Sequence, residues 1–157
     1  MSGRKLRSLA DTMAQPEHGA LARRVLEFLA VMDRVVNLPK QPAVTAADWA
    51  PLGELIDRER FHRVGNFGES VNWTEYTDLL VRWANMSWWK GYIWRLREAP
   101  PGAGQPAVVY LESEERSNRE HPVREDGDYE TLDSIAAYEF DAAGLITALH
   151  VYDQRPL

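Results

Sequence analysis

The chain has 157 residues, of which 45% are hydrophobic and 10% aromatic, which is enough for one hydrophobic core. It contains no cysteine, so disulfides, thiolate metal sites and cysteine nucleophiles are excluded. Its formal net charge of −6 at pH 7 opposes nucleic-acid binding, because recognition of phosphates needs a basic surface.

Residues 1–18 are expected to form a disordered or loosely attached segment, and residues 19–157 a single domain. The basic side chains of Arg4, Lys5 and Arg7 are interpreted as part of a solvated tail. No signal peptide is indicated, and no stretch reaches the roughly 20 apolar residues that a membrane span needs. We therefore expect a cytoplasmic protein that contacts neither nucleic acid nor membrane.

Three helices are predicted in the first half of the chain. The first has apolar residues at helical spacing over residues 21–36 and ends before Pro39. The second begins after Thr45, and the third begins after Asn72, since both side chains can cap a helix. The apolar stripe of the third helix consists of Tyr76, Leu79, Leu80 and Trp83.

A short strand is predicted over residues 60–66, between the second and third helices. Alternation along this strand places Phe61 and Arg63 on one face and His62 on the other. The glycines that follow indicate a turn.

Four long strands are predicted in the second half of the chain, where β-branched and aromatic residues are frequent. They cover residues 88–98, 107–117, 130–140 and 145–153. The connection over residues 141–144 is short enough to require an antiparallel hairpin. Helices followed by consecutive antiparallel strands indicate an α+β domain whose helices cover one face of the sheet.

This order of elements, with residues 25–29 on the first helix and 138–147 across the last hairpin, resembles the nuclear transport factor 2-like superfamily. The superfamily includes SnoaL-like polyketide cyclases, ketosteroid isomerases and limonene epoxide hydrolase. The resemblance implies a cone-shaped, curved antiparallel sheet, wrapped by three N-terminal helices around a central pocket. It also implies a homodimer formed through the sheet. It is more specific for the fold than for the reaction.

The resemblance and strand alternation together place polar side chains in this pocket. Arg63, Glu115 and Asp153 are the expected catalytic lining, in which one carboxylate acts as base and the other as acid. The trio resembles the acid–arginine–acid arrangement of limonene epoxide hydrolase. A structural ion cluster is the alternative interpretation. A slip of one residue in register would instead turn Glu112 and Glu114 toward the pocket.

The sequence departs from the catalytic patterns of these relatives. At the positions that match limonene epoxide hydrolase, Phe61 replaces a tyrosine and Arg63 replaces an asparagine. Ser113 replaces the arginine, and Val151 replaces one catalytic aspartate. The oxyanion-hole aspartate of ketosteroid isomerase matches Ala136. Steroid isomerisation by that set of residues is therefore not expected.

Two histidines, His62 and His150, are further catalytic candidates, because imidazole exchanges protons near pH 7. Partly buried strand residues are the alternative interpretation for both. The expected ligand-binding residues are Phe61, Trp88, Trp94, Ser113, Tyr138, Leu149 and Val151.

No cofactor and no metal are expected, because the sequence lacks the phosphate-loop, dinucleotide, zinc-protease and serine-hydrolase motifs. The predicted function is a cofactor-independent general acid–base enzyme that acts on an apolar oxygenated small molecule. It would be a cyclase, isomerase, dehydratase or epoxide-opening hydrolase. The alternative is a non-catalytic small-molecule-binding or accessory protein that uses the same pocket.

Overall fold

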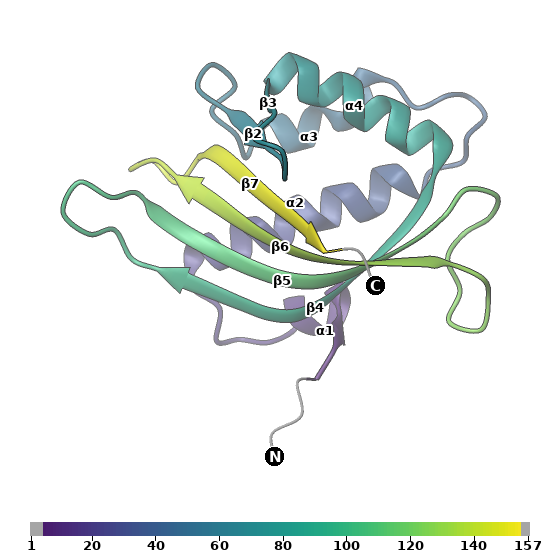
Figure 1. Cartoon of the computed structure of the whole chain (residues 1–157), viewed down its shortest axis with the longest axis horizontal. Helices are drawn as coiled ribbons and strands as arrows, with labels where there is room; N and C mark the ends of the chain where they lie inside the picture. Colours follow the sequence, from purple (N-terminus) through teal and green to yellow (C-terminus); the bar gives the residue numbers. More distant parts are fainter. Residues whose placement is uncertain (1–4, 155–157) are drawn as a thin grey trace.

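The structure, a computed structural model, describes residues 5–154, with side chains for residues 5–152 (Figure 1). Its helical elements are α1 (Leu9–Met13), α2 (Ala20–Val36), η1 (Ala46–Trp49), α3 (Ala50–Gly53) and α4 (Trp73–Met86). Its strands are β1 (Arg7–Ser8), β2 (His62–Val64), β3 (Ser70–Asn72), β4 (Trp88–Ala99), β5 (Ala107–Asn118), β6 (Glu130–Phe140) and β7 (Ile146–Gln154). The predicted α+β class is confirmed.

Within the described residues the strands form one curved sheet in the order β1-β4-β5-β6-β7-β2-β3. The long strands β4 to β7 pair antiparallel, as predicted. The sheet is nevertheless mixed, because β2 pairs with β7 in parallel. Most of the chain separates these two strands, so no tight hairpin forces them to run in opposite directions.

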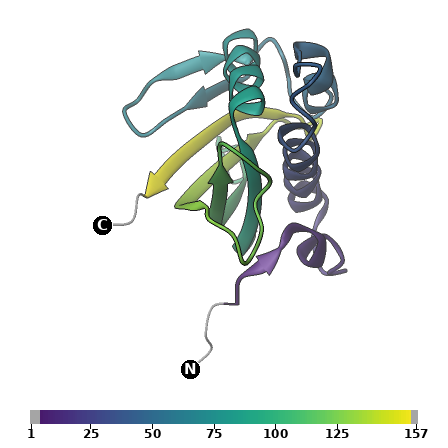
Figure 2. The ribbon, with the colours of Figure 1, turned by 90° about the vertical axis from the view of Figure 1, so that its right-hand side faces the viewer.

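The helices lie on one side of the sheet and leave the other side open. In Figure 1 α2 lies behind the long strands, and Figure 2, turned by 90°, shows α2 against the inner face of the sheet. The helices α3 and α4 lie near the edge formed by β2 and β3. No helix in the described part of the chain is long and apolar enough to cross a membrane.

The helix caps explain where two of the helical elements begin. The Asn72 side chain accepts a hydrogen bond from the Glu75 amide, and the Glu75 carboxylate accepts one from the Asn72 amide. Before η1, the Thr45 amide donates a hydrogen bond of 2.8 Å to the Asp48 carboxylate, and the Asp48 amide donates one of 3.1 Å to the Thr45 carbonyl. The predicted second helix is split into η1 and α3, because Pro51 lacks the N–H that a continuous α-helix would use.

The segment over residues 65–72 differs from the sequence prediction of a simple turn. Gly68, at φ 75°, turns the chain so that β3 pairs with β2 as a hairpin. The three residues of β3 are too few to show a pattern in the sequence, which is why the strand was not predicted.

Residues 7–13 also form elements that the sequence did not predict. β1 pairs with β4 through Arg7 and Ser8, and the Ser8 side chain accepts a hydrogen bond from the Asp11 amide at the start of α1. Thr12 on α1 is buried. The division of the chain at residue 18 stays a prediction.

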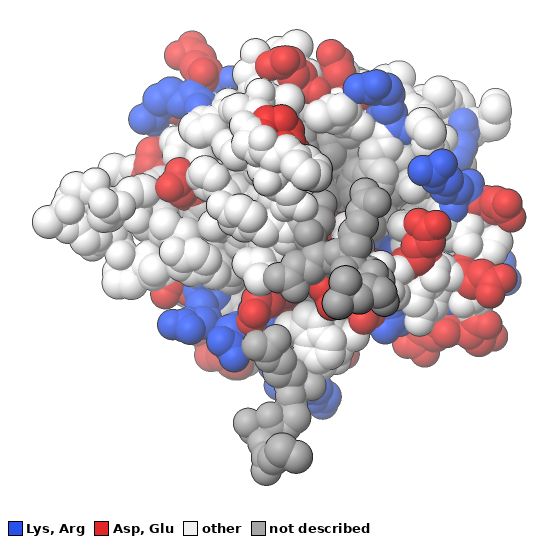
Figure 3. All heavy atoms as spheres, viewed as in Figure 1, with Lys and Arg blue, Asp and Glu red and all other residues white. Residues whose placement is uncertain are grey.

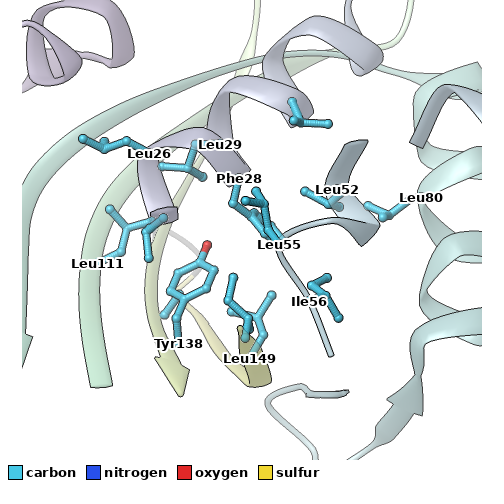
Figure 4. Close-up of a cluster of buried hydrophobic side chains, with 14 of the residues drawn as sticks. Leu26, Phe28, Leu29, Leu52, Leu55, Ile56, Leu80, Leu111, Tyr138 and Leu149 are labelled. Atoms are coloured by element: carbon cyan, nitrogen blue, oxygen red, sulfur yellow. The ribbon is translucent and has the colours of Figure 1, made fainter. Parts of the chain in front are cut away.

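The core lies between α2 and the inner face of the sheet. Figure 4 shows apolar side chains of α2 facing those of the strands. Phe28 contacts Tyr138 edge to face, with ring centroids 5.4 Å apart. This packing places the inner face of β5, β6 and β7 directly beneath the helix.

Candidate functional site

A cavity of about 440 Å³ opens between the sheet and the helices α2 and α4. Most of its lining is apolar. The apolar residues include Phe28, Leu29, Met32, Leu80, Leu111, Ala136, Leu149 and Val151. A cavity of this size and composition suits a small, largely apolar organic molecule.

A smaller set of polar side chains interrupts this lining. It consists of Arg63, Tyr76, Tyr92, Ser113, Glu115, Ser117, Ser134 and Tyr138. Among the described residues that line the cavity, Glu115 is the only carboxylate. The arrangement around Glu115 therefore decides what chemistry the cavity can support.

The Glu115 carboxylate is oriented by an indole from the neighbouring strand. Trp89 Nε1 donates a hydrogen bond of 2.9 Å to Glu115 Oε1. Gly91 lies directly opposite Glu115 in the β4–β5 register. A Cβ atom on Gly91 would come within 2.7 Å of the Trp89 indole, so the ring can occupy this place only because residue 91 has no side chain.

The backbone of Trp89 is held in turn by Asn37, which follows α2. The Asn37 side-chain amide donates to the Trp89 carbonyl at 2.8 Å, and its oxygen accepts from the Trp89 amide at 3.1 Å. The Trp89 ring also contacts Trp83 edge to face, with centroids 5.8 Å apart. The donor to Glu115 is thus fixed at both its backbone and its ring.

Two buried tyrosines provide neutral hydroxyl groups at the cavity. Burial raises the pKa of Tyr76 to about 12, with the Arg63 charge lowering it and the Glu115 charge raising it. Burial also raises the pKa of Tyr138, and Tyr76 and Glu115 add to this rise. The Arg63 guanidinium carbon lies 5.9 Å from the centroid of the Tyr76 ring. Both phenols therefore stay protonated near neutral pH and can donate hydrogen bonds.

Six of the residues that the sequence analysis placed in the site line the cavity together. They are Arg63, Ser113, Glu115, Tyr138, Leu149 and Val151. The register also shows which acidic residues of β5 face outward. Glu112 forms an ion pair with Arg95, and Glu114 forms one with Arg116. It is thus Glu115 that lines the cavity, as strand alternation predicted.

Three aromatic residues that were expected to bind ligand lie outside the cavity lining. Phe61 is buried and packs against Tyr76, with ring centroids 5.6 Å apart. The Trp88 ring is covered by Lys40, whose Nζ lies 4.0 Å from the ring centroid. Trp94 lies at an irregularity in the β4–β5 register, which changes the alternation of side chains along β4.

The two candidate histidines also lie away from the cavity. His62 and His150 contact each other edge to face, with centroids 6.3 Å apart, and His150 Nε2 lies 3.5 Å from Glu139 Oε2. Strand alternation turns them to the face opposite the cavity.

The backbone of Asp153 pairs with Ser134, but its side chain lies outside the described residues. The catalytic role of Asp153 stays a prediction.

Sequence reasoning missed four residues that shape the site: Tyr76, Trp89, Gly91 and Ser134. Tyr76 was recognised only as part of a helical stripe. Alternation along β6 places Ser134 on the same face as Tyr138, so the sequence could have indicated that Ser134 lines the cavity. The role of Trp89 depends on its contact with Gly91 and has no signature in the sequence.

Among the described residues, no group of three or more histidine, aspartate or glutamate side chains is arranged to hold a metal ion.

No model of a known protein family and no curated protein matches this sequence. Solved structures match along most of its length. An LEH-like epoxide hydrolase from M. tuberculosis is 16% identical, with a TM-score of 0.59 over 88% of this chain and 86% of that one. An NTF2-like protein from Exiguobacterium is 12% identical, with a TM-score of 0.58 over 85% and 99%. A chain of the C. albicans Mtr2–Mex67 M domain complex is 13% identical, with a TM-score of 0.57 over 91% and 99%. The expected nuclear transport factor 2-like fold is confirmed.

Proposed function

We propose that this chain, which has a nuclear transport factor 2-like fold, is a cofactor-independent enzyme that uses general acid–base catalysis on an apolar oxygenated small molecule. The observation that carries the proposal is the Glu115 carboxylate, which a tryptophan N–H orients within a cavity that is otherwise largely apolar. Structures of similar fold include an LEH-like epoxide hydrolase, which supports the general class.

In the proposed mechanism Glu115 is the base, and it removes a proton from a carbon or from a water molecule next to the substrate. Tyr76 and Tyr138 donate hydrogen bonds to the substrate oxygen on which negative charge develops, since both phenols remain protonated. The apolar walls limit access of water and so strengthen these interactions. Cyclisation, isomerisation, dehydration and epoxide opening all use such a pair of base and donor.

A second acid is part of the proposal and rests on Asp153, whose backbone lies opposite Ser134 on the neighbouring strand. The Arg63 guanidinium would keep one of the two carboxylates ionised. We do not include His62 and His150 in the mechanism, because their rings pack together with Glu139 away from the cavity lining.

The test compares Glu115→Gln with Glu112→Gln, a change of the same size on the outer face of the same strand. Two probes cover the main reaction types: exchange of the α-protons of 2-decalone in D₂O, followed by NMR, and hydrolysis of cyclohexene oxide, followed by mass spectrometry. For a probe that the wild-type protein turns over, loss of the base should lower the rate at least about 100-fold. Wild-type activity in Glu115→Gln would contradict the proposal.

A non-catalytic ligand-binding protein is the second candidate. It is favoured by the absence of a second carboxylate among the described residues that line the cavity. A binding protein would turn over neither probe and would release a co-purified ligand unchanged, as judged by mass spectrometry of the denatured protein. Either kind of protein uses the cavity, so a purely structural module is the less favoured interpretation.

We also propose that two copies associate through the outer face of the sheet. Tyr110 is 47% exposed and Tyr152 is 52% exposed, and Ile135 lies directly opposite Tyr152 in the register. Figure 3 shows a largely uncharged area at the left centre of the molecule, with charged side chains above it, below it and on the right. Exposed aromatic side chains on a sheet face are typical of protein interfaces.

A further inference from the structure

Two serines lie side by side on the sheet beneath the cavity. Ser113 on β5 and Ser134 on β6 are direct partners in the antiparallel register. They are only 8% and 6% exposed, and both belong to the cavity lining. The adjacent pair along the same two strands, Leu111 and Ala136, is apolar and also lines the cavity. The serines therefore form a small polar patch in an apolar part of the wall.

Neither serine side chain forms a hydrogen bond with another residue in the described part of the chain. Neither hydroxyl oxygen belongs to the fully enclosed side-chain atoms that lack a hydrogen-bond partner, so both open onto the cavity that their residues line. The chain thus presents two hydroxyl groups to the cavity, where a bound molecule can form hydrogen bonds with them.

We propose that the hydroxyl groups of Ser113 and Ser134 form a subsite that binds the carbonyl oxygen of the ligand. Directly opposed residues on antiparallel strands have Cβ atoms about 4.5–5.5 Å apart, so both hydroxyl groups can reach one oxygen atom. A carbonyl oxygen has two lone pairs and can accept both hydrogen bonds. This subsite rests on the proposed function, because it assigns the ligand class for the same cavity.

The position of the subsite also relates the bound oxygen to the base. Glu115 follows Ser113 by two residues on the same face of β5, which corresponds to about 7 Å along the strand. A ketone held by the serines would therefore place its neighbouring carbon atoms near Glu115. Arg63 and Glu115 carry opposite formal charges, so the described lining as a whole favours neither an anionic nor a cationic ligand. The ligand class is then a neutral ketone on a compact apolar skeleton.

The experiment uses a pair of probes of the same shape, 2-decalone and 2-methylenedecalin, in which a CH₂ group replaces the carbonyl oxygen. Binding to the full chain is followed by tryptophan fluorescence, because Trp83 and Trp89 line the cavity. Wild-type protein should bind the ketone more tightly than the alkene. Ser113→Ala and Ser134→Ala should each weaken ketone binding about three- to tenfold and leave alkene binding unchanged. Ser87→Ala, which changes a buried serine outside the cavity lining, should affect neither probe.

Equal affinity of the wild-type protein for the two probes, including a failure to bind either, would overturn the subsite. So would an equal effect of each serine variant on both probes, which would indicate a change of shape and not of hydrogen bonding. These measurements concern binding and need no turnover. A catalytically inactive Glu115→Gln protein that still prefers the ketone would support the subsite, and a normal rate in that variant would contradict only the proposed base.

Discussion

Trp89 and Glu115, on neighbouring strands, are joined by a hydrogen bond of 2.9 Å from the indole Nε1 to the carboxylate Oε1. The Trp89 indole packs over Gly91, and the Trp89 backbone forms two hydrogen bonds with the Asn37 side chain. The base of the proposed reaction is therefore positioned by a donor that the fold itself holds in place. Such orientation is what a general base needs to meet the proton it removes.

Replacing Trp89 by phenylalanine keeps an aromatic ring at this position and removes the donor. We expect the turnover number to fall about 10- to 100-fold, since a hydrogen bond to a charged group contributes about 1.5–3 kcal/mol. Steady-state kinetics on the active probe measure this effect. Trp94→Phe is the matched control, because Trp94 lies outside the cavity lining. An unchanged turnover number in Trp89→Phe would argue against a positioning role.

Replacing Gly91 by alanine should displace the Trp89 ring, because the new Cβ would lie 2.7 Å from it. We expect a changed near-ultraviolet circular dichroism spectrum and a loss of about 1–3 kcal/mol in the free energy of unfolding. Urea denaturation provides the second measurement. Gly102→Ala serves as control, since a Cβ there would meet nothing within 4 Å. A wild-type spectrum and stability in Gly91→Ala would mean that the Trp89 indole packs less tightly against residue 91 than the structure indicates.

The raised pKa of Tyr76 predicts how stability changes at high pH. The phenol titrates near 10.0 in the unfolded chain and at about 12 in the folded protein. Between these values the folded state binds more protons, so the free energy of unfolding should fall as pH rises, by up to about 1.4 kcal/mol per pH unit. Tyr76→Phe should reduce this slope in urea denaturation between pH 9 and 11. A steeper fall of the free energy of unfolding with pH in the variant would be opposite to this expectation and would contradict the raised pKa of Tyr76.

The proposed dimer is tested on the two exposed tyrosines of the outer face. Tyr110→Arg combined with Tyr152→Arg should place like charges in the interface and shift the protein toward a monomer. Light scattering coupled to size-exclusion chromatography measures the mass directly. Phe67→Arg is the control, because Phe67 is 94% exposed on the β2–β3 hairpin. A wild-type protein that is already monomeric at the highest concentration would contradict the dimer.

Much of the architecture could be predicted from the sequence because it depends on local signals. The cap formed by Asn72 and Glu75 sets the start of α4, and the period of the apolar residues separates helices from strands. Alternation along β5 was sufficient to turn Ser113 and Glu115 to one face and Glu112 to the other. These features involve residues that are close in the chain.

The contacts between distant residues were decided only by the tertiary structure. The parallel pairing of β2 with β7 brings Arg63 beside Leu149 at the cavity, and no local pattern encodes it. Trp89 lines the cavity and Trp94 does not, because the β4–β5 register is irregular and because Gly91 leaves space for the Trp89 ring. The sequence alone therefore determined the main helices, the four long strands and the inner faces of β5 and β7. Which side chains meet in the cavity was decided by packing, since it depends on how the sheet curves around α2.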